Sequence, residues 1–130
     1  VMGDFDSISG DIVEYYRRIE SVQLIEFQPE KDDTDTMMAV RYALEQGFEQ
    51  IRICAALGGR LDHSIGNLSA AAYVAKQLGS CYVYGAEETA ILLYNDYVCL
   101  HRTKAEEFVS VFAWTEKVTS IVLRQIHFRV

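Results

Sequence analysis

Residues 51–57 have the sequence IRICAAL, a near-continuous apolar run of strand length that ends at Gly58-Gly59. A run of this kind is typical of a strand covered on both faces of a sheet. Apolar residues then recur at helical spacing over 63–78, so we expect a long helix there. A strand, a loop and a helix in this order form the unit from which parallel sheets are built.

The same alternation extends on both sides of this unit. We expect a helix over 11–19, a strand over 22–27 and a helix over 36–46. Residues 1–3 resemble the end of a strand, and a further strand after the long helix ends at Tyr84. Helices and strands that alternate in this way predict an α/β domain with a parallel sheet and crossover helices.

The pattern changes after Gly85. Short β-prone runs without helical periodicity cover 89–93, 97–102, 108–114 and 119–127. We therefore expect a domain boundary between residues 86 and 87 and an antiparallel second domain after it. Four strands in about 45 residues are too few for an independent sandwich. We expect both domains to be incomplete and the chain to be a fragment of a longer protein.

The net charge of −7 is concentrated in the first 35 residues, which hold ten acidic and three basic side chains. Such a field repels nucleic acid and anionic membranes and attracts divalent cations. No apolar run approaches 18 residues, and the first residues lack the regions of a signal peptide, so we expect neither a membrane span nor secretion. Three distant cysteines without a CxxC motif predict reduced, buried thiols of a cytoplasmic protein.

Three segments that could carry chemistry follow expected strands. The first is GDFDS, residues 3–7. In extended backbone Asp4 and Asp6 point to the same side, while Phe5 packs inward. Two convergent carboxylates suit Mg²⁺, which prefers oxygen ligands. The alternative is an Asp-rich turn that caps the next helix.

The second segment is PEKDDTD, residues 29–35, between a strand and a helix. Asp33 or Thr34 can serve as the helix N-cap, and Asp35 suits the positive end of the helix dipole. Capping explains one or two of these residues. Four acids around Lys31 repel one another unless they share a cation, so the segment favours a cation site.

The third segment is GGRLDH, residues 58–63. Glycines at the carboxyl end of a strand let the backbone approach a ligand, and the helix N-terminus that follows favours phosphate. Arg60 can hold phosphate oxygens with its two-pronged guanidinium. Asp62 can cap the helix or hold a polar substrate atom, whereas a lone His63 is more often structural. Because all three segments lie at the carboxyl ends of expected parallel strands, together they predict a Mg²⁺–phosphate site.

These three motifs, with Asn67 one turn further on, resemble thiamin pyrophosphokinases in order and approximate spacing. The similarity extends over essentially the whole chain, because residues 116–123 resemble the start of that family's β-sandwich. It implies a Rossmann-like, ATP-binding catalytic domain over 1–86 and the start of a thiamin-binding antiparallel β-sandwich over 87–130. Where the family often has a glycine before GGRLDH, this chain has Cys54-Ala55-Ala56, a departure that we expect to be harmless.

The resemblance also implies an activity. It implies Mg²⁺-dependent transfer of pyrophosphate from ATP to the hydroxyl of thiamin, which yields thiamin diphosphate and AMP. The enzyme would be a homodimer with its active sites between the subunits. Carried over by motif, the carboxylates for Mg²⁺ and pyrophosphate are Asp4, Asp6 and Asp35. The other implied site residues are Asp32, which would orient the thiamin hydroxyl, Lys31 and Thr34 in the same pocket, and Arg60, Asp62 and His63 against nucleotide or thiamin.

Two other functions remain open from the residues alone. A phosphohydrolase of the haloacid-dehalogenase type would use Asp4 as its nucleophile, but only Asn95-Asp96 offers a weak candidate for its later acidic pair. A non-catalytic module would keep the site for Mg²⁺ and nucleotide without turnover. Release of phosphate, or of no product, would distinguish these functions from release of AMP.

Overall fold

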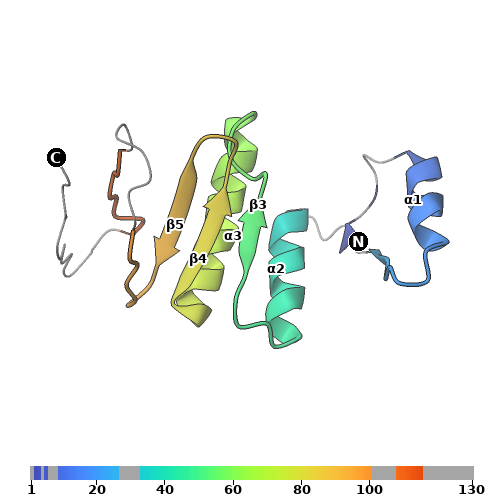
Figure 1. The fold of residues 1–130 in the computed structure, drawn as a ribbon, viewed down its shortest axis with the longest axis horizontal. Coiled ribbons are helices and arrows are strands. Elements are labelled where there is room, and N and C mark those ends of the chain that lie inside the picture. Colours follow the sequence, from blue (N-terminus) through green and yellow to red (C-terminus); the bar gives the residue numbers. More distant parts are fainter. Residues whose placement is uncertain (1, 4, 6–8, 27–32, 101–107, 116–130) are drawn as a thin grey trace. The chain divides into compact units, whose positions relative to one another are not determined.

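The computed structural model describes residues 2–3, 5, 9–26, 33–100 and 108–115 of the chain (Figure 1). The helices and strands within them are β1 (Met2–Gly3), α1 (Gly10–Arg17), β2 (Ile25–Glu26), α2 (Asp35–Glu45), β3 (Arg52–Cys54), α3 (Leu61–Leu78), β4 (Ser80–Tyr84) and β5 (Thr89–Leu93). The expected alternation of helices and strands up to Tyr84 is confirmed, and the fold is mixed α/β.

The described strands form two ladders. β1 and β2 pair in parallel, with Met2 opposite Ile25. β3, β4 and β5 form a three-stranded sheet in that order, parallel between β3 and β4 and antiparallel between β4 and β5. From the sequence we expected the strand over 89–93 in the second domain. In the structure this strand, β5, completes the sheet of the first domain instead. The reason is local: the Gly85 N–H donates to the Glu88 carbonyl at 2.9 Å and closes a turn too short for a crossover.

The core lies between this sheet and the two helices α2 and α3. On β4 the buried residues alternate, as in a strand with one covered face. The fully or nearly buried residues are Val40 on α2, Ala70, Ala71, Val74 and Ala75 on α3, Cys81 and Val83 on β4, and Ala56 after β3. The alanines on α3 have only methyl side chains, so they let this helix approach the strands closely.

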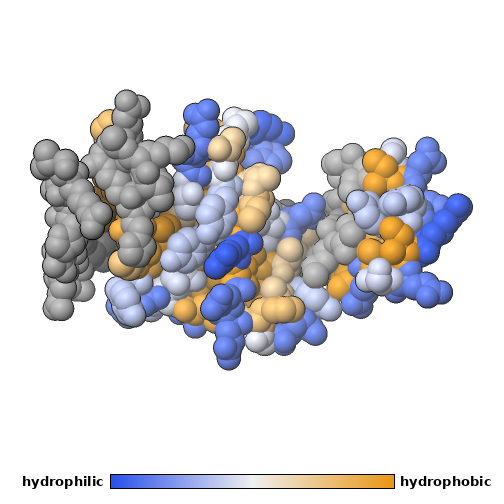
Figure 2. Space-filling view, viewed as in Figure 1, coloured by the Kyte–Doolittle hydropathy of each residue, from blue (hydrophilic) through white to orange (hydrophobic). Residues whose placement is uncertain are grey.

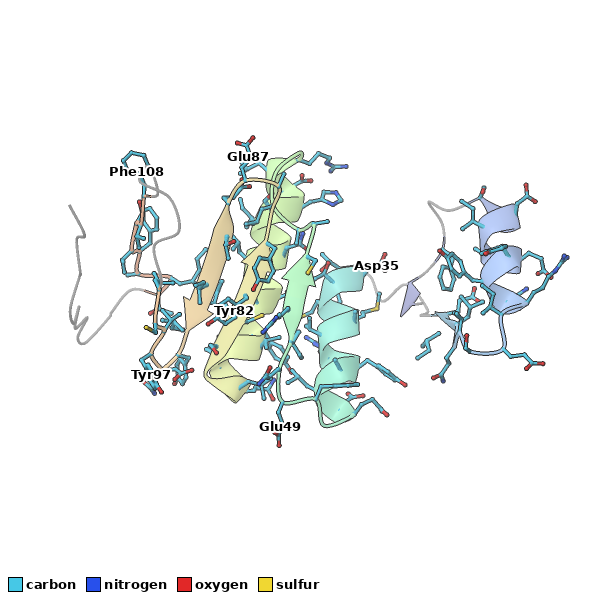
Figure 3. All side chains as sticks on the ribbon, in the orientation of Figure 1. Asp35, Glu49, Tyr82, Glu87, Tyr97 and Phe108 are labelled. Atoms are coloured by element: carbon cyan, nitrogen blue, oxygen red, sulfur yellow. The ribbon has the colours of Figure 1, made fainter. Side chains whose placement is uncertain are left out.

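The opposite face of the same sheet is open. On β3, Ile53 is half-buried while Arg52 and Cys54 are exposed, so the expected coverage of this strand on both faces is wrong. Tyr82 and Tyr84 lie on the open face with their rings stacked at 6.3 Å (Figure 3). Hydrophilic and hydrophobic residues lie side by side over these strands (Figure 2).

Cys54, Cys81 and Cys99 are reduced thiols, as expected, but only Cys81 is buried. Cys54 and Cys99 are exposed, so the expectation of buried thiols is wrong for them. Cys54 is exposed because it lies on the open face of β3. None of the helices in the described ranges is long and apolar enough to cross a membrane.

The chain divides by its backbone contacts into residues 1–98 and 99–130. Neither 97–100 nor 108–113 contains a strand, so the strands expected there are wrong for these residues. The strand expected over 119–127 and the sandwich-like segment 116–123 lie outside the described residues. The β-sandwich therefore stays a prediction.

Candidate functional site

Residues 33–35 of the second segment and the whole third segment lie at one edge of the β3–β4–β5 sheet. Both α2 and α3 begin at the edge where β3 and β4 end, because the helices run antiparallel to these parallel strands (Figure 1). Asp35 starts α2 at this edge (Figure 3), and the GGRLDH segment leads into α3 there. Residues 33–35 and the GGRLDH segment thus lie at one sheet edge, although β2, the strand before the second segment, pairs with β1 and not with this sheet.

Thr34 is the N-cap of α2. Its backbone is extended, with φ −82° and ψ 155°, and its side-chain oxygen accepts a hydrogen bond of 3.2 Å from the Met37 N–H. This decides between the two residues that the sequence offered for the cap. Asp35 lies in the first turn, where the helix dipole favours a negative charge. No described residue pairs with its exposed carboxylate, which therefore remains available to a cation.

Asp33, one residue before the cap, has a partner instead. Its Oδ2 lies 2.9 Å from Nη1 of Arg41 on α2. The Arg41 guanidinium also lies over the ring of Tyr73 on α3, 5.5 Å from the ring centroid. Sequence reasoning did not assign Arg41 to the site. Its place among Met37, Val40 and Leu44 on the apolar side of the helix was the available signal.

The GGRLDH segment makes a tight turn before α3. Gly58 and Gly59 have φ of 90° and 67°, a region in which glycine avoids the strain that a Cβ atom causes. Arg60 donates to Asp62 twice, from Nε to Oδ1 at 3.1 Å and from Nη2 to Oδ2 at 2.5 Å. This hydrogen bonding lowers the pKa of Asp62 and raises the pKa of Arg60. The guanidinium expected to hold phosphate thus holds a carboxylate in this structure.

Further hydrogen bonds join this segment to the body of α3. The hydroxyl of Ser64, which sequence reasoning did not single out, donates to the Gly58 or Arg60 carbonyl, each at 3.3 Å. The Asn67 amide donates to the Ala56 carbonyl at 2.9 Å. His63 is exposed in the first turn of the helix. The turn is therefore fixed to the helix that follows it.

The remaining predicted site residues, Asp4, Asp6, Lys31 and Asp32, lie outside the described residues. β1, which Asp4 follows in sequence, lies beside α2, whose first residue is Asp35. Within the described ranges, no three His, Cys, Asp or Glu side chains gather as a metal site. Asp35 is the one predicted metal ligand within these ranges, and the set of three carboxylates stays a prediction.

The three motifs lie within a part of the chain that matches a known family. Residues 1–83 match the family model described as thiamin pyrophosphokinase, catalytic domain. The chain belongs to the thiamin pyrophosphokinase family. This confirms the resemblance seen in GDFDS, PEKDDTD and GGRLDH.

Individual members of the family show the same similarity. Thiamine pyrophosphokinase of Bacillus subtilis is 44% identical over 68 residues, which cover 51% of this chain and 30% of the relative. Thiamine pyrophosphokinase 1 of Oryza sativa subsp. japonica is 32% identical over 75 residues, which cover 53% of this chain and 28% of the relative. The match thus spans less than a third of the length of these relatives.

Solved structures of the family share the fold. The crystal structure of thiamin pyrophosphokinase from Geobacillus thermodenitrificans aligns with a TM-score of 0.50 and 32% identity, over 64% of this chain and 37% of that one. The structure from Bacillus subtilis aligns with a TM-score of 0.52 and 28% identity, over 65% of this chain and 39% of that one.

Proposed function

We propose that the protein to which this chain belongs transfers pyrophosphate from ATP to the hydroxyl of thiamin and releases AMP. The observation that carries the proposal is the shared edge of the β3–β4–β5 sheet, where Asp35 starts α2 and GGRLDH starts α3. Two helix N-termini at one edge supply backbone N–H groups and positive dipole ends, which favour phosphate. Membership of the thiamin pyrophosphokinase family supports thiamin and ATP as the substrates.

Mg²⁺ fits the donor set at the start of α2. The Asp35 carboxylate is exposed and has no partner among the described residues, and carboxylate oxygens are the ligands that Mg²⁺ prefers. We assign Mg²⁺ to Asp4, Asp6 and Asp35; the position of β1 beside α2 supports this grouping. When bound, the ion neutralises the phosphate charge during transfer.

The other site residues bind and orient the substrates. Asp32 accepts a hydrogen bond from the thiamin hydroxyl and directs it at the β-phosphorus. Lys31 and Thr34 line the same pocket, although the Thr34 oxygen already accepts the bond that caps α2. Arg60 exchanges the Asp62 carboxylate for phosphate oxygens, since a guanidinium presents the same paired donors to both groups. Asp62 and His63 then face the nucleotide or thiamin.

The proposal extends to the architecture and assembly of the whole protein. Residues 1–98, which include β5, belong to a Rossmann-like ATP-binding domain, and residues 99–130 begin the β-sandwich that binds thiamin. Phe108 and Phe112 expose 94% and 83% of their surface, and side chains of this size are normally covered within a sandwich. The active protein is a cytoplasmic homodimer with its active sites in clefts between the subunits.

Product analysis tests this function. The complete protein is incubated with ATP, Mg²⁺ and thiamin, and the products are identified by mass spectrometry. We expect AMP and thiamin diphosphate in equal amounts. Release of phosphate would indicate the hydrolase that uses Asp4, and substrate binding without AMP would indicate the non-catalytic module. No described contact favours either alternative.

A pair of variants on one helix tests the metal assignment. Asp35→Asn should lower turnover by about 100-fold or more, the scale of a lost electrostatic contact in a transition state. Glu45→Gln, an equally exposed change at the other end of α2, is the matched control and should retain turnover. Equal activity of the two variants at limiting and at saturating Mg²⁺ would remove Asp35 from the site.

A further inference from the structure

Arg41 is a charged residue of α2 beside the residues of that helix that pack on the core, and 47% of its side chain is exposed. Val40, the residue before it, is only 4% exposed, and the neighbouring Met37 and Leu44 pack against the core. Its guanidinium has two partners, the Asp33 carboxylate at 2.9 Å and the Tyr73 ring at 5.5 Å.

These partners hold the segment that precedes α2. Asp33 lies one residue before the N-cap, whereas Arg41 is the seventh residue of the helix, so their ion pair turns the segment back along the helix flank. Tyr73 lies on α3, so the same guanidinium also links the segment to that helix. A Cβ atom on Gly66 of α3 would lie 3.7 Å from Thr34 Cγ2, so Thr34 also lies against α3.

The ion pair separates two acids that are close in sequence. Asp33 is 21% exposed and its charge is balanced by Arg41, whereas Asp35 is exposed and has no described partner. Without the arginine, two like charges two residues apart would compete for the same cation and repel each other. Because Asp33 is paired, Asp35 is the acid of residues 33–35 whose carboxylate stays unpaired among the described residues at the sheet edge.

We propose that Arg41 is a positioning residue for the metal carboxylate Asp35. By holding Asp33 against the flank of α2, with Tyr73 behind it, Arg41 fixes the path of residues 33–35 and hence the direction of the Asp35 carboxylate. The proposal rests on the proposed pyrophosphokinase function. It assigns different tasks to Asp33 and Asp35 within one acidic segment.

Two measurements on the complete protein test this role. The first is the Mg²⁺ concentration at half-maximal rate together with kcat at saturating Mg²⁺. The second is the Kd for Mn²⁺ in the absence of turnover, measured by electron paramagnetic resonance. In Arg41→Met both the Mg²⁺ requirement and the Kd should rise by about tenfold or more, as for other lost outer partners of metal ligands. The kcat at saturating Mg²⁺ should change far less.

Companion variants separate positioning from general stability. Arg41→Lys, which keeps the charge for Asp33, should restore most of the metal affinity. The double variant Asp33→Asn/Arg41→Met should be no weaker than Arg41→Met alone, because the two residues act as one unit. Arg17→Met, which removes an exposed ion pair with Glu14 on α1, is the matched control and should leave the Mn²⁺ affinity unchanged.

The possible failures are distinguishable. If the unaltered protein forms no AMP, the proposed function is wrong and this role falls with it. If the protein is active but Arg41→Met and Asp33→Asn both bind Mn²⁺ as the unaltered protein does, only the positioning role is wrong. A lower melting temperature in Arg41→Met with unchanged metal affinity would likewise overturn it and leave a purely structural ion pair.

Discussion

The side-chain amide of Asn67 donates a hydrogen bond of 2.9 Å to the backbone carbonyl of Ala56 and joins α3 to the segment that follows β3. Ala56 is only 7% exposed, so water cannot readily replace this bond. Asn67→Ala should lower the free energy of unfolding by about 1–3 kcal/mol, because a buried carbonyl is left unpaired. Urea denaturation monitored by circular dichroism measures the change.

A second variant on the same helix is the control for Asn67. The Ser69 hydroxyl donates to the Ile65 carbonyl, also at 2.9 Å, but this bond is exposed and lies within one helix turn. Ser69→Ala should change the unfolding free energy by less than about 0.5 kcal/mol. Equal losses in the two variants would contradict a special role for the Asn67–Ala56 bond.

Ala55 has a backbone conformation that suits glycine. Its φ is 57°, in the left-handed region where a Cβ atom costs about 1 kcal/mol or more. We expected the departure at Cys54-Ala55-Ala56 to be harmless, but it places one residue in a conformation that disfavours a Cβ atom. Ala55→Gly should raise the unfolding free energy by about 0.5–1 kcal/mol in the same denaturation experiment. Ala43→Gly, inside α2, should lower it by about 1 kcal/mol; a loss in both variants would argue against strain at Ala55.

The pKa of Asp62 lies below its ordinary value of 3.8, mainly because Arg60 donates to the ionised carboxylate. The stabilisation from this pair is present above the ordinary pKa and is lost as the pH falls through the lowered value. In Arg60→Met the pKa of Asp62 should rise towards 3.8, which an NMR titration of the side-chain carboxyl carbon would show. Arg52→Met, which removes an arginine exposed on β3, should leave it unchanged. No difference between the two variants would mean that the pair does not form in solution.

Burial raises the pKa of the Cys81 thiol to about 11, from an ordinary 9.0. Its Sγ donates to the Ile51 carbonyl at 3.6 Å, and the side chain has no exposed surface. At neutral pH the smaller thiolate fraction alone should slow alkylation of Cys81 by about 100-fold relative to an ordinary cysteine. Peptide mass spectrometry after brief treatment with iodoacetamide should find Cys54 modified and Cys81 intact. Simultaneous modification of both would show that the core opens readily.

Helices were easier to predict from this sequence than strands. The helices expected over 36–46 and 63–78 are observed as Asp35–Glu45 and Leu61–Leu78, because apolar periodicity and the residues at helix ends are local signals. The strand expected over 51–57 extends only over Arg52–Cys54. Strand limits depend on the partner's ladder, here the three pairs with Tyr82–Tyr84, and local sequence does not carry that information.

The candidate site was predictable only in part, because only some of its features depend on local sequence. Thr34 and Asp35 occupy the cap and first turn that their residue types favour, so their sequence position sufficed. The Arg41–Asp33 pair was not predicted, since it depends on how the segment before α2 turns back along the helix. Nor was the occupation of Arg60 by Asp62, because it depends on side-chain rotamers within the turn.

The buried alanines of α3 also affect the position of the far end of this helix. Ala70, Ala71 and Ala75 fix the gap between helix and sheet, and they leave no room for larger groups. An 18-residue helix is a stiff rod of about 27 Å, so a wedge inserted at Ala71 would tilt it and displace its far tip most. That tip bears Asp62 and His63. Methyl groups hidden in the interior thus set the position of the exposed end of α3.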